Sequence, residues 1–153
     1  MNLIFSTLWG NISPQNSWLV QKSITDFHVI KCNNKLFNIC HFNLAHSESL
    51  QFLKTELNRN KNGKYVVVTH HVPTLLNYPE KYRDDPVNEA FAVELFDFIE
   101  QSEAGFWIYG HHHTNVTEFS IGKTKLVTNQ LGYIRCNEQS GFRTNAVIST
   151  KDM

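Results

Sequence analysis

Cysteine pairs and long apolar runs are both missing from this chain of 153 residues, and each absence excludes a class of protein. The three cysteines are odd in number and lack a C-x-x-C spacing, which argues against a disulfide framework and predicts reduced, buried thiols. No apolar run approaches the roughly 20 residues that a membrane span needs. The amino terminus lacks the basic region and the small cleavage-site residues of a signal peptide. We therefore expect a cytoplasmic protein without a membrane partner.

Net charge is missing as well. Lys and Arg together number 14, and so do Asp and Glu, which leaves a formal net charge of zero when histidine is neutral. A balanced charge provides no bulk attraction to nucleic acid, so we expect no such partner. The 41% of hydrophobic residues suffices for one ordinary core. We therefore predict a single domain over residues 1–153.

The apolar residues alternate between the spacing of strands and that of helices, which predicts an α/β fold with a sheet covered on both faces. Strands are expected at 3–8, 36–41, 64–69 and 106–110. Helices are expected near 18–19, from 47 to 63, and from 86 to 103, the last with Asp85 as its cap and Pro86 in its first position. The stretches 116–133 and 142–150 alternate as antiparallel strands or hairpins do, with Gly122 and Gly141 at the turns.

Five of the eight histidines follow two of these strands directly, in "YVVVTHHVP" and "FWIYGHHHTN". The carboxyl ends of parallel strands meet at one edge of a sheet, where α/β proteins bind ligands. Imidazole is a common ligand of zinc, iron and manganese. After the flexible Gly110, His111 and His113 are expected to point the same way and His112 to point elsewhere. A lone loop histidine is usually solvated, but two clusters at equivalent strand ends favour a metal site.

The segments "VVVTHHVPT" and "WIYGHHHTN" resemble the last two motifs of the calcineurin-like metallophosphoesterases. "STLWGN" and "LVTNQLGY" resemble further segments of a bacterial subgroup of that family. The resemblance implies a four-layer α/β/β/α sandwich with mixed sheets and hydrolysis of a phosphomonoester or phosphodiester at two divalent ions of manganese, iron or zinc. It implies that His70 and His111 share one metal and that His113 binds the second. His71 is the alternative to His70, and His71 and His112 are otherwise implied to contact substrate.

Three earlier motifs of that family, Asp-x-His, Gly-Asp and Gly-Asn-His-Asp/Glu, are not in this chain. The "DFH" at 26–28 does not follow an apolar strand, so we interpret Asp26 as structural or close to the substrate cleft. The family's catalytic histidine is therefore not assigned here. Without a bridging aspartate, two divalent ions would repel each other, so three neutral histidines are expected to hold at most one ion. We expect the chain alone to be inactive.

The resemblance thus describes 1–153 as a truncated domain, the C-terminal half of the sandwich, arising from a truncated gene, an interrupted reading frame or a misassigned start. An exposed sheet edge would then bind a separate N-terminal fragment or a second copy. The alternative is a non-catalytic binding or regulatory remnant that holds at most one metal. A structural zinc site of Cys32, Cys40 and His41 matches no closed tetrahedral spacing. In the loop before residue 86, Tyr82 and Arg83 are either substrate-facing or solvated.

Overall fold

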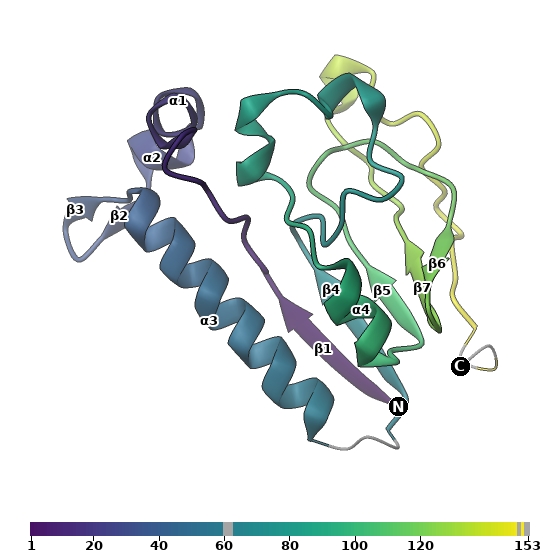
Figure 1. Ribbon diagram of the computed structural model, residues 1–153. Coiled ribbons are helices and arrows are strands. Elements are labelled where there is room, and N and C mark those ends of the chain that lie inside the picture. The colour runs from purple at the N-terminus through teal and green to yellow at the C-terminus, as the bar shows by residue number, and fades with distance from the viewer. Residues whose placement is uncertain (60–62, 150, 152–153) are drawn as a thin grey trace.

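The computed structural model describes residues 1–59, 63–149 and 151, and its centre is a five-stranded mixed sheet (Figure 1). The strands lie in the order β1 (Asn2–Ser6), β4 (Tyr65–Thr69), β5 (Phe106–Ile108), β7 (Thr124–Val127) and β6 (Phe119–Ile121). The first four are parallel to their neighbours, and β6 is antiparallel to β7. The predicted α/β class and mixed sheet are confirmed.

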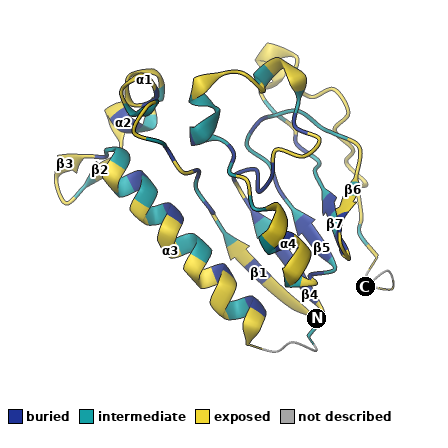
Figure 2. Ribbon diagram, in the orientation of Figure 1, coloured by how far each residue is buried: buried dark blue, intermediate teal, exposed yellow. Residues whose placement is uncertain are grey.

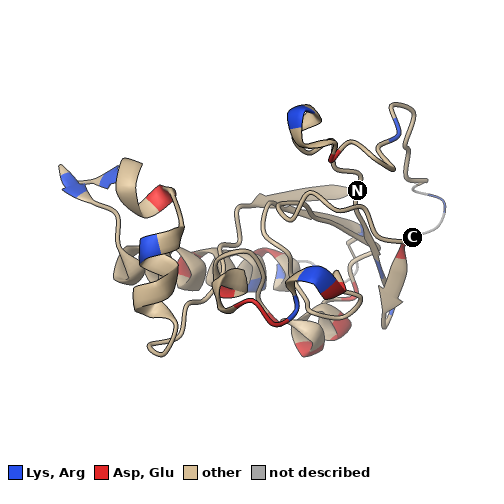
Figure 3. Cartoon of the chain, turned by 90° about the horizontal axis from the view of Figure 1, so that it is seen from above, with Lys and Arg blue, Asp and Glu red and all other residues tan. Residues whose placement is uncertain are grey.

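Two helices, α3 (Ile39–Asn58) and α4 (Phe96–Ser102), cover one face of this sheet (Figure 3). The strand register places one residue of each parallel strand in a single row, namely Ile4, Val67, Trp107 and Leu126. These side chains are 5% exposed or less and share one apolar cluster with Leu53 and Leu57 of α3 and Ile99 of α4. Burial of this row fixes which face of each strand turns inward.

The opposite face of the sheet is only partly covered, so the prediction of a sheet covered on both faces is met in part. Leu3 and Phe5 of the edge strand β1 are 53% and 64% exposed, whereas Val66 and Phe106 on the neighbouring strands are buried (Figure 2). The reason is that α3 and α4 both contribute to the cluster on the face of Ile4. The uncovered edge therefore carries exposed apolar side chains at β1.

A small subdomain lies before the start of α3. It consists of α1 (Ser17–Ser23), α2 (Asp26–Val29) and the hairpin β2 (Lys31–Cys32) and β3 (Lys35–Leu36). The predicted strand at 36–41 is wrong, because the side chain of Asn38 accepts the N–H of His41 at 3.1 Å and starts α3 at Ile39. The helix therefore begins well before Ser47 and ends at Asn58, before the predicted end at Gly63, and residues 60–62 lie outside the described residues.

The predicted helix from 86 to 103 is two separate pieces, the 3₁₀ helix η2 (Pro86–Ala90) and α4. The predicted cap is present, since Asp85 accepts the N–H of Val87 at 3.0 Å. Between the pieces the backbone pairs with the strand extension after β4: Val72 donates to Phe91 and Val93 donates to Val72, each at 3.0 Å. These bonds pull Phe91 out of a helix and toward the carboxyl edge of the sheet.

The β6–β7 hairpin about Gly122 was predicted, and it is confirmed. No strand forms at 142–149, so the second predicted alternation is wrong, and Thr150 lies outside the described residues. Two further 3₁₀ helices, η1 (Glu80–Tyr82) and η3 (Ile134–Cys136), complete the described elements. All three cysteines are free, and Cys40 and Cys136 are exposed, which corrects the prediction of buried thiols. Within the described ranges, no helix has the length and apolar character to cross a membrane.

Candidate functional site

The two histidine clusters meet at the carboxyl ends of β4 and β5, as the strand order predicts. The loops are joined by the backbone, because the N–H of Gly110 donates to the carbonyl of His70 at 3.2 Å. The ring centroids of His70 and His111 are 4.4 Å apart. Those of His71 and His111 are also 4.4 Å apart. Imidazoles of adjacent parallel strands therefore lie in direct contact.

His70 and His71 differ in their surroundings. His70 is exposed and lines a cavity. His71 is 3% exposed, packs 5.5 Å from the ring of Trp9, and places Nδ1 3.0 Å from the carbonyl of Thr7. Because a carbonyl only accepts, Nδ1 carries the proton and donates. Burial lowers the pKa of His71 to about 4, so this neutral ring ties the β4 loop to the segment after β1.

His111 lies between the other histidines and an apolar ring. Its imidazole stacks on Phe91 at a centroid distance of 4.7 Å and an interplanar angle of 28°. Burial, followed by the neighbouring His71 and His70, lowers the pKa of His111 to about 3. At neutral pH this ring is uncharged and keeps a nitrogen lone pair, as a metal ligand must.

His112 is buried, at 6% exposed, and is held by Gln130. The carboxamide of Gln130 is oriented because its Oε1 accepts the N–H of His113 at 2.9 Å. Its Nε2 then donates to Nδ1 of His112 at 3.1 Å, and the N–H of Thr114 donates to the same atom at 3.2 Å. The proton of His112 must therefore sit on Nε2. Burial lowers its pKa to about 4, so the ring stays neutral with one N–H to offer.

His113 is paired with a carboxylate that the sequence did not suggest. Its Nδ1 lies 2.8 Å from Oε2 of Glu138, which also accepts the N–H of Tyr133 at 2.7 Å. These contacts, led by the backbone N–H, lower the pKa of Glu138. A carboxylate that accepts a hydrogen bond from the Nδ1–H of a neutral imidazole leaves Nε2 with its lone pair, which is the arrangement found behind histidine ligands of metals.

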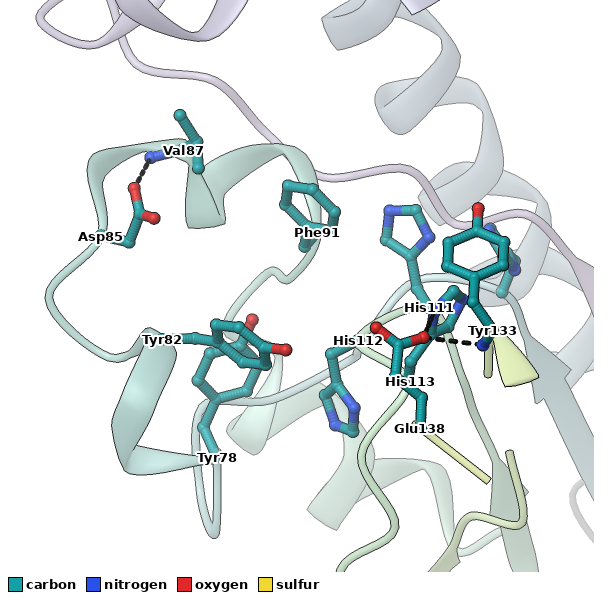
Figure 4. A pocket seen from close by; sticks show the side chains of 11 residues that line it. Tyr78, Tyr82, Asp85, Val87, Phe91, His111, His112, His113, Tyr133 and Glu138 are labelled. Atoms are coloured by element: carbon teal, nitrogen blue, oxygen red, sulfur yellow. Dashed lines mark hydrogen bonds and ion pairs between the residues drawn. The ribbon is translucent and has the colours of Figure 1, made fainter. Parts of the chain in front are cut away.

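A cavity of about 460 Å³ opens beside the histidines (Figure 4). Its lining consists of His70, His111, His112 and His113 together with Tyr78, Tyr82, Asp85, Val87, Phe91, Tyr133 and Glu138. Of the two loop residues singled out from the sequence, Tyr82 lines this cavity and Arg83 is exposed outside the lining. Asp26 lies close enough to His70 for its charge to oppose the lowering of that pKa by burial.

The fit to a metal ion is incomplete within the described part of the chain. No group of three His, Cys, Asp or Glu side chains is placed there to share one ion, and this includes the proposed zinc group at Cys32, Cys40 and His41. His71 and His112 already use Nδ1 in hydrogen bonds. The residues with suitable donor chemistry are His70, His111 and His113, and they lack a carboxylate positioned to share a metal with them.

Besides Glu138, two features of the site were missed in the sequence. Gln130 follows the end of β7, and the rule applied to the histidines, that polar residues after strands meet at one edge, could have found it. Backbone strain had no sequence signal: Leu8 and Trp9 adopt φ of 69° and 55° after β1, and His111 adopts 76°. Such conformations are unfavourable for residues other than glycine and gather at functional sites.

The comparisons with known proteins place this chain beside one viral relative. The chain is 35% identical over 159 residues to the uncharacterized protein L509 of Acanthamoeba polyphaga mimivirus, a match that covers 97% of this chain and 55% of the relative. The chain thus spans about half the length of that relative. No family model matches the chain. No solved structure matches it.

Proposed function

We propose that this chain forms the histidine-bearing part of a metal-dependent phosphoesterase of the calcineurin-like kind. The observation that carries the proposal is the contact of His70 and His111, with ring centroids 4.4 Å apart, across adjacent parallel strands at the rim of a cavity. The sequence motifs around both residues supply the reaction class. Both rings have pKa values lowered mainly by burial, which favours the neutral form that binds metals.

Each histidine has a proposed role. His70 and His111 would bind one divalent ion through ring nitrogens, and His113 would bind a second through Nε2 while its Nδ1–H donates to Glu138. A pair of manganese, iron or zinc ions would supply a nucleophilic hydroxide and neutralise charge on the phosphoryl oxygens. His71 holds the loop after β4 through its bond to Thr7, and His112, which lines the cavity, would offer its Nε2–H to the substrate.

The carboxylate ligands are proposed to come from polypeptide beyond this chain. The exposed apolar side chains of β1, Leu3 and Phe5, provide a face against which a second sheet packs, which would complete the four-layer sandwich. The partner is a separate N-terminal fragment or, failing that, a second copy of this chain. The mimivirus relative has additional chain of comparable length that this sequence does not match.

Hydrolysis of bis(p-nitrophenyl) phosphate with manganese tests the function. The isolated chain should show negligible turnover, because the described residues place no bridging carboxylate among the three histidines. The nucleotide sequence before the Met1 codon should encode Asp-x-His, Gly-Asp and Gly-Asn-His motifs, and the longer chain made from it should hydrolyse the substrate.

Single substitutions in that longer chain then assign the residues. His111→Ala and His70→Ala should each abolish turnover. His28→Ala should not, because His28 lies exposed on α2 and serves as the matched control. Turnover that survives His111→Ala, or robust manganese-dependent turnover by the isolated chain, would contradict the proposal.

A non-catalytic binding module is the second candidate, and the internal bonding of two histidines favours it. His71 and His112 both use Nδ1 in hydrogen bonds within the fold, so these two histidines have a structural role. Such a module would bind ligands in the cavity and hold at most one metal. A longer chain that folds and binds ligand but stays inactive with manganese would support this candidate over the enzyme.

A further inference from the structure

We propose that the cavity beside the histidines receives a planar aromatic group, so that the substrate is a phosphate ester of a nucleoside or of an aryl alcohol. The phosphate end of this assignment rests on the proposed function. The aromatic end rests on the cavity wall alone. Figure 4 shows the two ends, with His111 and His113 on one side, Tyr78 and Tyr82 across from them, and Phe91 beside His111.

The wall is formed by aromatic rings from separate segments. Tyr82 lies on η1 and is half-buried, above the buried Tyr78 at a centroid distance of 6.4 Å. Phe91 was pulled out of a helix by its bond to Val72 and presents its ring beside His111. Partly exposed rings in a concave site bind flat aromatic ligands by stacking and burial of apolar area.

Carboxylates at both ends of the cavity disfavour a ligand that extends its anionic groups along it. Asp85 and Glu138 are the acidic side chains of the lining, and Lys81 lies outside it with Nζ 4.4 Å from the ring centroid of Tyr82. A sugar phosphate or polyphosphate that extended toward Asp85 would therefore meet a carboxylate instead of a cation. An uncharged ring avoids that repulsion.

Two polar groups are placed to read the edge of such a ring. Nε2 of His112 carries a proton because Gln130 and Thr114 both donate to Nδ1. Asp85 is fixed by accepting the N–H of Val87 at 3.0 Å and offers acceptor oxygens at the far end of the cavity. A donor on one side and an acceptor on the other match the ring nitrogens and amino groups of a nucleobase.

Binding to the isolated, metal-free chain tests the assignment without requiring turnover. Adenosine monophosphate, phenyl phosphate and ribose phosphate are titrated in chelator while the NMR signals of Tyr82, Phe91 and His112 are followed. The two aromatic esters should shift these signals, and ribose phosphate should bind at least about tenfold more weakly, since stacking of one base contributes about that factor or more. Stronger binding of adenosine monophosphate than of phenyl phosphate assigns a nucleobase, and the reverse order assigns a small aryl group.

Tyr82→Leu and Phe91→Leu should each weaken binding of adenosine monophosphate about five- to tenfold. Trp18→Leu is the matched control, because Trp18 is 72% exposed on α1 and outside the cavity lining. Three results would overturn the assignment. Ribose phosphate could bind as tightly as the aromatic esters, neither of the two aromatic esters could bind, or the affinity could stay unchanged in both folded leucine variants. Addition of manganese to chelator-free samples of the same chain tests the metal ligands separately, so either proposal can fail without the other.

Discussion

Replacement of Gln130 by methionine should destabilise the loop that carries the three histidines. Gln130 is 9% exposed, and its side chain hydrogen-bonds to several buried groups at once. Its Oε1 accepts the N–H of His113 at 2.9 Å, and its Nε2 lies 3.1 Å from Nδ1 of His112 and 3.0 Å from the carbonyl of Thr114. Methionine has a similar length but neither donates nor accepts at these positions.

The magnitude follows from the groups left without partners. A buried polar group that loses its partner costs about 1–3 kcal/mol, and water entering from the cavity restores part of this. Because several groups lose their partner together, we expect Gln130→Met to lower the free energy of unfolding by about 3 kcal/mol. For a domain of this size that loss lowers Tm by roughly 6–12 °C.

Urea denaturation and calorimetry measure the effect. Gln139→Met is the matched control, because Gln139 is exposed and should change stability by less than about 0.5 kcal/mol. Gln130→Glu keeps an acceptor for His113 but has no proton for Nδ1 of His112 at neutral pH. The loss of unfolding free energy in Gln130→Glu, relative to the unsubstituted chain, should therefore become smaller as acid protonates His112. A loss below about 0.5 kcal/mol in Gln130→Met would refute the reasoning.

Three further outcomes are expected. Burial holds the pKa of His71 and His112 at about 4 against an ordinary 6.5, so the unfolded chain takes up more protons as pH falls through this window. The free energy of unfolding should drop by up to about 3 kcal/mol per histidine between those values, and a flat denaturation profile there would contradict this. Gly10→Ala would place Cβ in steric overlap with the carbonyl oxygen of Glu89, so urea melts should show a loss of at least about 1 kcal/mol; wild-type stability would contradict the packing. Phe5→Lys should leave stability within about 0.5 kcal/mol and reduce self-association in light scattering; a large destabilisation would mean that Phe5 is not the exposed side chain described.

The sheet was the most predictable part of the fold. β4 and β5 consist mostly of consecutive apolar residues, and such runs are typical of strands buried on both faces of a sheet. The helix expected over 86–103 failed because the backbone of Phe91 and Val93 pairs with Val72, a tertiary contact that no local periodicity reports. The strand expected at 36–41 failed for the opposite reason, a local cap at Asn38 that outweighs the apolar character of the residues after it.

The site, like the fold, has a part that the sequence predicts and a part that it does not. That the histidines after β4 and β5 lie together could be predicted because parallel strands deliver their carboxyl ends to one edge. Which histidines line the cavity could not be predicted. It depends on the carbonyl of Thr7, which fixes the ring of His71, and on Gln130, which fixes the orientation of His112. Glu138 lies in an irregular segment far along the chain, so its pairing with His113 has no signal in spacing or periodicity.

Paramagnetic broadening by manganese in the NMR spectrum of the isolated chain tests the central claim most directly, because it detects even weak binding. Titration of Mn²⁺ should broaden the ring signals of His70, His111 and His113 before those of any other histidine. His111→Ala should weaken the effect at His70, whereas His28→Ala should leave it unchanged. Broadening that spares these three rings, or that persists at His70 in the His111→Ala variant, would contradict a shared metal site at the carboxyl ends of β4 and β5.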